Sequence, residues 1–290
     1  IEQTVDLPKT LFIVASKSGS TIETDSFFKY FFAKTGNNAD QFIAITDPGS
    51  QLAGQAEQLG FRDLFLNPAD IGGRYSALSY FGLVPAALMG IDLDRLWASA
   101  EMMMMACAAN VTAGDHPGMW LGAILGVMAE AGKTKVSIHS SPSISTLGDW
   151  IEQLVAESTG KEGKGLIPVV GATVGKPHDY STDRLFVFVR VAGDDNEAID
   201  SGCKSLQQAG HPCVVLGLDD AYQVAGEFFR WEYATAIAGK LIGINPFDEP
   251  NVTESKNNTA RLLEVVKENG ALPSGTQMVV EDGEVLYADD

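Results

Sequence analysis

The sequence predicts an α/β fold built from two doubly wound parallel sheets, each flanked by helices in three layers. Short apolar runs rich in branched residues alternate with helix-length segments near the start of the chain, and the same alternation returns in its second half. A mostly helical stretch, residues 76–131, separates the two series. Strands and helices that alternate in this way form parallel sheets with right-handed crossovers.

The first sheet is predicted within residues 11–66. Leu11–Ala15 is a continuous apolar run, as expected of a strand that is buried on both faces. A small polar turn follows, and Ile22–Lys34 then carries four phenylalanines at helical spacing. The other elements expected here are a strand at Gln41–Thr46, a helix at Gln51–Leu59 and a strand at Arg62–Leu66.

The middle of the chain is predicted to be helical and to lead into the second sheet. Helices are expected at Ala77–Met89, Leu93–Ala109 and Gly118–Ala131. The run Met102–Met105 is interpreted as part of a buried helix, because side chains at consecutive helical positions point all round. The strands of the second sheet are expected at Thr134–His139, Arg184–Val191 and Pro212–Leu218. Its helices are expected at Ile144–Val155, Asn196–Ala209 and Ala221–Ile242, with a glycine-rich loop between the first of them and the strand at Arg184.

The end of the chain is predicted to form a helix and a hairpin. Asn251–Asn269 is amphipathic, and Gln277–Val280 and Val285–Tyr287 flank a tight turn at Asp282 and Gly283. Together the elements predict two domains, a first α/β unit at residues 1–100 and a second at residues 101–290 that includes the C-terminal helix and tail.

Composition and charge limit the function. The 290 residues are 45% apolar and 20% charged, which is typical of a soluble globular protein, and the net charge is −18. An average field of this sign repels nucleic acids and membrane surfaces, and the apolar runs are shorter than the roughly 20 residues that span a bilayer. Three unpaired cysteines favour the reducing cytoplasm. Four histidines without a Cys/His cluster indicate no metal site.

A candidate anion site lies at Ser16–Thr21 (SKSGST), between the end of a predicted strand and the start of a helix. Unpaired amides and the helix dipole attract anions there, and Ser16, Ser18 and Thr21 can donate hydrogen bonds to phosphate oxygens. Lys17 is harder to place in direct contact. The alternative is a plain capping box, Ser20–Glu23. The Walker-type spacing is absent.

Four ordered motifs resemble the glucose-6-phosphate isomerase family of sugar isomerase (SIS) domains. LFIVASKSGSTIET resembles the family's phosphosugar-binding loop, and Gly72–Ser79 (GGRYSALS) resembles its G-G-R-[FY]-S signature. Ala156–Lys161 (AESTGK) resembles the segment that carries the catalytic base. Asn245–Lys256 (NPFDEPNVTESK) resembles the C-terminal signature. The expected fold is therefore a pair of SIS-type units.

Within these motifs, the amino-acid sequence is most similar to the isomerase half of bifunctional transaldolase/glucose-6-phosphate isomerase proteins. Glu157–Gly165 and the Asn-Pro-Phe-Asp segment carry this similarity, whereas nothing resembles the transaldolase half, so a fused transaldolase domain stays an open alternative. Family members have a G-I-G-G-S strand and loop ahead of the first motif. It is not found here, and we expect the N-terminal part of the fold to be missing.

The resemblance implies an aldose–ketose isomerase that interconverts glucose 6-phosphate and fructose 6-phosphate through an enediol, in glycolysis and gluconeogenesis, without a cofactor. It makes Glu157 the base, Arg74 the group that stabilises the enediolate, and Lys256 a helper in ring opening. The residues implied to hold the phosphate are Ser16, Lys17, Ser18 and Thr21. Those implied to contact the substrate are Gly73 and Glu249.

Two positions depart from the family pattern. Glu249 stands where the family usually has glutamine, and an ionised carboxylate there can only accept hydrogen bonds. The family's ring-opening histidine, which reaches the active site of a neighbouring subunit, has no matching motif. His178 is a candidate for it, with a surface-loop histidine as the alternative.

Two other functions stay open. One is a phosphoglucose/phosphomannose isomerase of wider specificity on the same fold. The other is a non-catalytic module that binds a sugar phosphate, although such a module needs only the phosphate loop and not Glu157, Arg74 and Lys256. The partner expected by analogy is a second copy in a homodimer.

Overall fold

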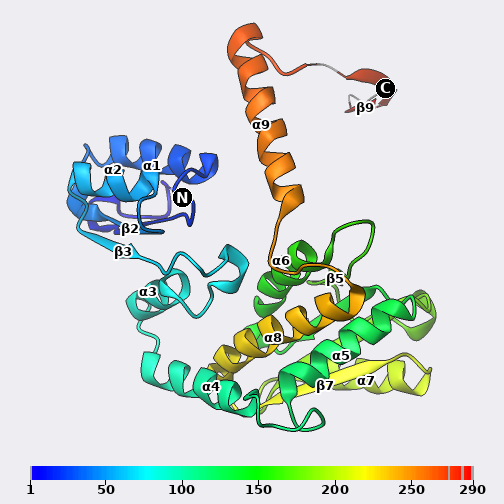
Figure 1. Ribbon diagram of the computed structural model, residues 1–290. Helices are drawn as coiled ribbons and strands as arrows, with labels where there is room; N and C mark the ends of the chain where they lie inside the picture. Colours follow the sequence, from blue (N-terminus) through cyan, green and yellow to red (C-terminus); the bar gives the residue numbers. More distant parts are fainter. Residues whose placement is uncertain (1, 274, 282–283, 289–290) are drawn as a thin grey trace. The chain divides into compact units, whose positions relative to one another are not determined.

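The computed structural model describes residues 2–273, 275–281 and 284–288 (Figure 1). The chain forms two compact units, Ile1–Phe247 and Asp248–Asp290. The first unit contains both parallel sheets, and the second contains the last helix and a hairpin. The boundary expected near residue 100 stays a prediction. Among the described residues, every helix is too short or too polar to cross a lipid bilayer.

The first sheet has the order β1-β2-β3, and all its strands are parallel. Its elements are β1 (Phe12–Ala15), α1 (Ile22–Lys34), β2 (Phe42–Thr46), α2 (Gln51–Leu59) and β3 (Asp63–Leu66), with short 3-10 turns at Leu7–Lys9 and Ala39–Gln41. Phe42, which is fully buried in β2, stacks on Phe12 with ring centroids 4.9 Å apart. Phe28 and Phe31 of α1 complete this core, so the predicted elements are confirmed.

The second sheet has the order β5-β4-β6-β7 and is also parallel. Its elements are β4 (Lys135–Ser140), α6 (Leu147–Thr159), β5 (Ile167–Val169), β6 (Arg184–Val191), α7 (Glu197–Gln208), β7 (Cys213–Leu218) and α8 (Val224–Ile242). Short 3-10 turns lie at Pro142–Ile144, Pro177–Asp179 and Ala221–Gln223. The core clusters between this sheet and α5, α6 and α8. The fold class predicted from the sequence, parallel sheets flanked by helices, is confirmed.

Two details of this half differ from the sequence expectation. The segment of β5 was expected to be a loop, because it is only three residues long and contains Pro168. It forms a strand at the edge of the sheet, where proline is tolerated because one side of the strand needs no hydrogen bond to a neighbour. Helix α6 begins three residues later than expected and continues to Thr159, where Gly160 is its C-cap. Glu157 therefore lies in the last turn of a helix rather than in a loop.

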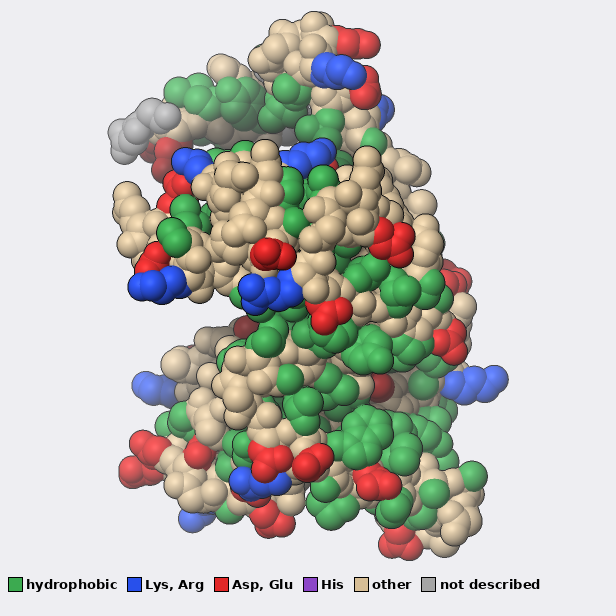
Figure 2. Space-filling model, turned by 90° about the vertical axis from the view of Figure 1, so that its left-hand side faces the viewer, with side chains coloured by type: hydrophobic (Ala, Val, Ile, Leu, Met, Phe, Trp, Pro, Cys, Tyr) green, Lys and Arg blue, Asp and Glu red, His purple; other side chains and the backbone are tan. Residues whose placement is uncertain are grey.

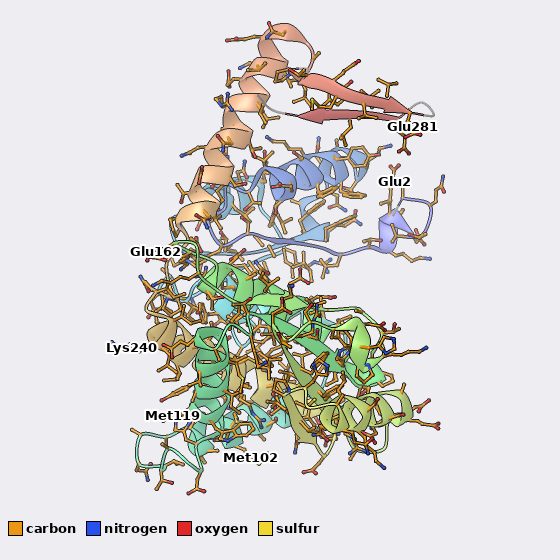
Figure 3. All side chains as sticks on the ribbon, turned by 90° about the vertical axis from the view of Figure 1, so that its right-hand side faces the viewer. Glu2, Met102, Met119, Glu162, Lys240 and Glu281 are labelled. Carbon is orange, nitrogen blue, oxygen red and sulfur yellow. The ribbon has the colours of Figure 1, made fainter. Side chains whose placement is uncertain are left out.

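Three helices connect the sheets: α3 (Tyr80–Leu88), α4 (Leu93–Ala106) and α5 (Pro117–Glu130). The interpretation of Met102–Met105 as buried is wrong: Met102, Met104 and Met105 are 58%, 47% and 62% exposed. Helix α4 packs on α8 through Ser99 and Met103, which lie against Gly226, so the other methionines face outward. Hydrophobic side chains are accordingly prominent on the face in Figure 2, and Figure 3 shows Met102 at the surface.

Glycines allow α5 to approach α8 closely. A Cβ placed on Gly122 would lie 2.6 Å from the carbonyl oxygen of Ala234 and 2.6 Å from the Cβ of Ile237. Gly118 and Gly126 are similarly close to Tyr233 and Leu241. One face of α5 is thus fitted to the backbone of α8.

We expect Gly122→Ala to destabilise the protein by about 1–3 kcal/mol, because the added methyl group has no room and the helices must move apart. The measurement is the free energy of unfolding in urea. Gly54→Ala is the matched control: Gly54 lies on an exposed part of α2, a Cβ there meets nothing within 4 Å, and alanine favours a helix by about 1 kcal/mol. Equal effects of the two changes would contradict the close packing.

The second unit consists of α9 (Pro250–Asn269) and an antiparallel pair, β8 (Thr276–Glu281) and β9 (Glu284–Ala288). The predicted helix and hairpin strands are confirmed. The tight turn predicted at Asp282 and Gly283 lies outside the described residues. Within this second unit, none of the described residues of α9 is buried.

Candidate active site

The loop Ser16–Thr21 connects β1 to the N-terminus of the 13-residue helix α1. Ser16 is buried, and its Oγ is 2.9 Å from Thr21 Oγ1. The predicted alternative, a capping box from Ser20 to Glu23, does not form: Thr21 is the N-cap, and its side chain makes no capping hydrogen bond. The first amides of α1 are therefore directed at the loop without a side-chain cap, as an anion site requires.

Gly19 determines the shape of this loop. Its φ is 65°, and a Cβ there would lie 2.8 Å from both the backbone nitrogen of Leu52 and the side chain of Ser50. Only glycine accepts this conformation and this close approach at once. The loop therefore packs directly on the N-terminus of α2, where Ser50 caps the helix by accepting from the Ala53 amide.

Lys17 extends from the loop toward the ends of the neighbouring strands. Its ammonium group donates to Asp47 Oδ2 at 2.5 Å and to the Ala69 carbonyl oxygen at 3.3 Å. Asp47 follows β2 and Ala69 follows β3, so Lys17 connects the loops after all three strands of the first sheet. The ammonium group is thus paired with Asp47 and the Ala69 carbonyl oxygen, and its direct contact with phosphate stays a prediction.

Arg74 and Glu157 lie together, although they come from different halves of the chain. Arg74 is in a 3-10 turn (Gly73–Tyr75) and is only 3% exposed, whereas the side chain of Glu157 is 32% exposed. Arg74 Nη1 is 3.5 Å from Glu157 Oε2. A buried guanidinium therefore lies beside a carboxylate that solvent can reach.

Neutral groups hold the guanidinium in this orientation. Arg74 Nε donates to Ser158 Oγ at 2.8 Å, and Nη2 donates to the Pro246 carbonyl oxygen at 2.9 Å. The Tyr75 hydroxyl bonds to the same two groups, at 3.0 Å from Ser158 Oγ and 3.1 Å from the Pro246 oxygen. Burial raises the pKa of Tyr75, so it stays a neutral hydrogen-bond donor. Ser158 and Tyr75 were missed as orienting residues, although both lie inside the recognised motifs.

The turn after α6 holds Glu157 in place. Thr159 Oγ1 donates to the Val155 carbonyl oxygen and accepts from the Leu166 amide, which folds the glycine-rich loop back onto the helix. Lys161 is buried, with its ammonium group 2.5 Å from the Asn245 carbonyl oxygen. Gly165 has a φ of 129°, and a Cβ there would lie 2.6 Å from the Thr159 carbonyl oxygen. The sequence E-S-T-G-K thus connects α6, which carries Glu157, to the segment before Phe247.

Four predicted residues remain to be located, and each is described within its own unit. Gly73 begins the 3-10 turn of Arg74, and its carbonyl oxygen accepts from the Ser76 hydroxyl. The side chain of His178 is 77% exposed on the loop before β6, with Nε2 3.4 Å from Asp179. Glu249 and Lys256 belong to the second unit, at the N-cap and in the second turn of α9. The roles of these residues stay predictions. Within the described residues, no three His, Cys, Asp or Glu side chains are grouped to hold a metal ion.

No family model matches the chain. Among curated proteins, the glucose-6-phosphate isomerase of Leptospira biflexa is 28% identical over 294 residues, covering 86% of this chain and 65% of that protein. The glucose-6-phosphate isomerase of Enterococcus faecalis is 27% identical over 302 residues, with the same coverage. The chain thus spans about 65% of the length of the curated relatives that it matches.

Solved structures share the fold. The hypothetical protein TT0462 from Thermus thermophilus matches with a TM-score of 0.79 and 26% identity, over 90% of this chain and 73% of that one. A glucose-6-phosphate isomerase from Chlamydia trachomatis matches with a TM-score of 0.72 and 18% identity, over 92% and 62%. A tagatose-6-phosphate ketose/aldose isomerase from Escherichia coli matches with a TM-score of 0.53 and 13% identity, over 86% and 73%. The last two likenesses concern the fold alone.

Proposed function

We propose that this chain, a homologue of the glucose-6-phosphate isomerases, is itself an aldose–ketose isomerase that interconverts glucose 6-phosphate and fructose 6-phosphate through an enediol. The observation that carries the proposal is the Arg74–Glu157 pair, with 3.5 Å between a buried guanidinium and a partly exposed carboxylate. Homology to curated isomerases over 86% of the chain supports it.

The reaction moves a proton between C1 and C2 of the open-chain sugar. A carboxylate such as that of Glu157 can take the proton from one carbon and return it to the other. The intermediate is an enediolate, and the negative charge that develops on its oxygen needs a positive group that is already in position. Arg74 fits this role because its guanidinium is always charged and its orientation is fixed by Ser158 and Pro246.

The β1–α1 loop is proposed to hold the phosphate, through the hydroxyls of Ser16, Ser18 and Thr21 and the first amides of α1. Anchoring the phosphate keeps the reacting carbons in place and lowers the entropy cost of the reaction. Lys17, held by Asp47, would add positive charge behind the loop. Ring opening is assigned to Lys256, with Glu249 against the sugar and His178 as the candidate histidine.

The setting of the enzyme follows from the same resemblance. We propose a glycolytic and gluconeogenic role in the cytoplasm, in a homodimer that needs no cofactor. Purified protein with fructose 6-phosphate and a coupled glucose-6-phosphate dehydrogenase assay tests the activity. Parallel turnover of mannose 6-phosphate would instead indicate the wider phosphoglucose/phosphomannose specificity. Saturable binding of fructose 6-phosphate without product would indicate a non-catalytic module.

We expect Gly19→Ala to raise KM for fructose 6-phosphate roughly ten- to a hundredfold, because a displaced loop loses charge-assisted hydrogen bonds to the phosphate. Gly36→Ala is the matched control. Gly36 has a similar φ of 67°, so both changes carry the same backbone strain, but a Cβ on Gly36 meets nothing within 4 Å. Steady-state kinetics measures both; an unchanged KM in Gly19→Ala would remove the loop from phosphate binding.

A further inference from the structure

A cavity of about 440 Å³ lies beside Tyr75 in the first unit and is bounded by the segment around Asp70, by α4 and by α8. Four aromatic side chains line it: Tyr75, Trp97, Phe229 and Phe247. Trp97 and Phe247 are 53% and 64% exposed, so the cavity opens to solvent. The proposed isomerase chemistry does not use it.

The charged residues that line this cavity are all acidic. Asp70 and Glu101 are exposed, whereas the side-chain oxygen Oε1 of Glu232 is buried and has no hydrogen-bond partner. Burial raises the pKa of Glu232 to about 8. The nearby arginine on the same helix, Arg230, pairs with Glu227 at 3.2 Å and not with Glu232. Across the cavity, the Tyr75 hydroxyl is a further titratable group, in addition to the carboxyl groups of Asp70 and Glu101.

We propose that this cavity binds an organic cation of the guanidinium or alkylammonium type, which pairs with Glu232 between the aromatic walls. Aromatic faces attract such cations through their quadrupoles, and a carboxylate supplies the charge. Asp70 and Glu101 at the opening disfavour an anion. A small metal ion needs several oxygen ligands close together, and among the described residues the carboxylates of this cavity are not grouped in that way.

Binding of a cation must be coupled to a proton. In the free protein Glu232 is mostly protonated at pH 7, since its pKa is about 8. A bound cation favours the ionised carboxylate and lowers this pKa, so binding releases a proton. Affinity should therefore rise about tenfold per pH unit up to pH 8 and level off above it. A neutral or anionic ligand would not show this dependence.

Calorimetric titration of the whole chain with methylguanidinium and with n-butylammonium tests the proposal, in two buffers of different ionisation enthalpy at pH 6, 7 and 8. We expect saturable binding, release of nearly one proton at pH 7, and a loss of affinity of at least tenfold in Glu232→Gln. Glu152→Gln, which changes an exposed glutamate of α6 outside the cavity, is the control for general surface charge and should change affinity less than threefold. Absence of saturable binding at pH 8, or equal binding by wild type and Glu232→Gln, overturns the proposal.

Two further measurements complete the test. Trp97→Leu, on the exposed wall, leaves Glu232 in place and should weaken binding severalfold even where Glu232→Gln folds poorly; unchanged affinity overturns the role of the aromatic wall. Sedimentation distinguishes the source of the cation. Self-association that depends on Glu232 and is reversed by methylguanidinium identifies a lysine or arginine of a second copy, whereas binding of the free cation with an association state that does not depend on Glu232 identifies a small molecule. No sugar phosphate is present, so the outcome is independent of isomerase activity.

Discussion

Glu157→Gln is expected to lower kcat for the isomerisation of fructose 6-phosphate by about 10²- to 10⁴-fold, with KM nearly unchanged. Glutamine has the same size and keeps the hydrogen bonding of the last turn of α6, but it cannot accept a proton from carbon. The loss therefore falls on the transition state and not on substrate binding. The coupled dehydrogenase assay, run to saturation with both proteins, measures kcat and KM separately.

Glu152→Gln is the matched control, because Glu152 lies on an exposed face of the same helix and undergoes the same chemical change. Its kcat should equal that of the wild type. Equal kcat values for Glu157→Gln and the wild type would remove Glu157 as the base and leave binding of the sugar phosphate as the function of the site.

The elements of the fold could be predicted because local patterns determine them. The apolar run of β1 and the phenylalanine spacing of α1 gave boundaries within one residue of the structure. β5 escaped because a three-residue edge strand containing Pro168 has neither the length nor the composition of a strand. The burial of the Met102–Met105 run was mispredicted because a hydrophobic side chain is not necessarily covered by other parts of the chain.

The candidate site was predicted as a set of residues without the contacts between them, and the roles of those residues stay predictions. Motif resemblance selected Arg74 and Glu157, yet only the fold brings their side chains within 3.5 Å. Ser158 and Tyr75 bond to Arg74 or to its carbonyl acceptor, and Lys161 closes the turn behind Glu157. These three residues have no periodicity that marks them, because their roles depend on contacts between distant segments. Spacing in the sequence identifies chemistry, whereas three-dimensional packing identifies orientation.

The second large effect is expected for Arg74→Lys, which should lower kcat/KM by about 10²- to 10³-fold. Lysine keeps the positive charge near Glu157 but loses the planar fork that bonds Ser158 and the Pro246 carbonyl oxygen simultaneously. Its ammonium group would no longer be fixed where charge develops on the enediolate. The measurement is the coupled assay, with kcat and KM determined separately.

Arg190→Lys is the matched control for this substitution. Arg190, on β6, bonds Asp200 of α7 through two nitrogens, at 2.6 and 2.8 Å, and both side chains are exposed. The change breaks an equally well-formed fork but should leave kcat/KM within about threefold of the wild type, since exposed ion pairs contribute little. Equal losses of kcat/KM in the two variants would show that the loss comes from replacing any arginine by lysine and not from the position of Arg74.

Ser158→Ala distinguishes a catalytic role of Arg74 from a role in the stability of the fold alone. This change removes the acceptor of Arg74 Nε and one partner of the Tyr75 hydroxyl, while both charges stay in place. We expect Ser158→Ala to lower kcat by about tenfold, the equivalent of one hydrogen bond of about 1.4 kcal/mol, with unfolding in urea shifted only slightly. If orientation of the guanidinium supports catalysis, kcat falls in the order wild type, Ser158→Ala, Arg74→Lys. If the arginine only stabilises the fold, the three proteins will differ in unfolding free energy and have the same kcat once folded.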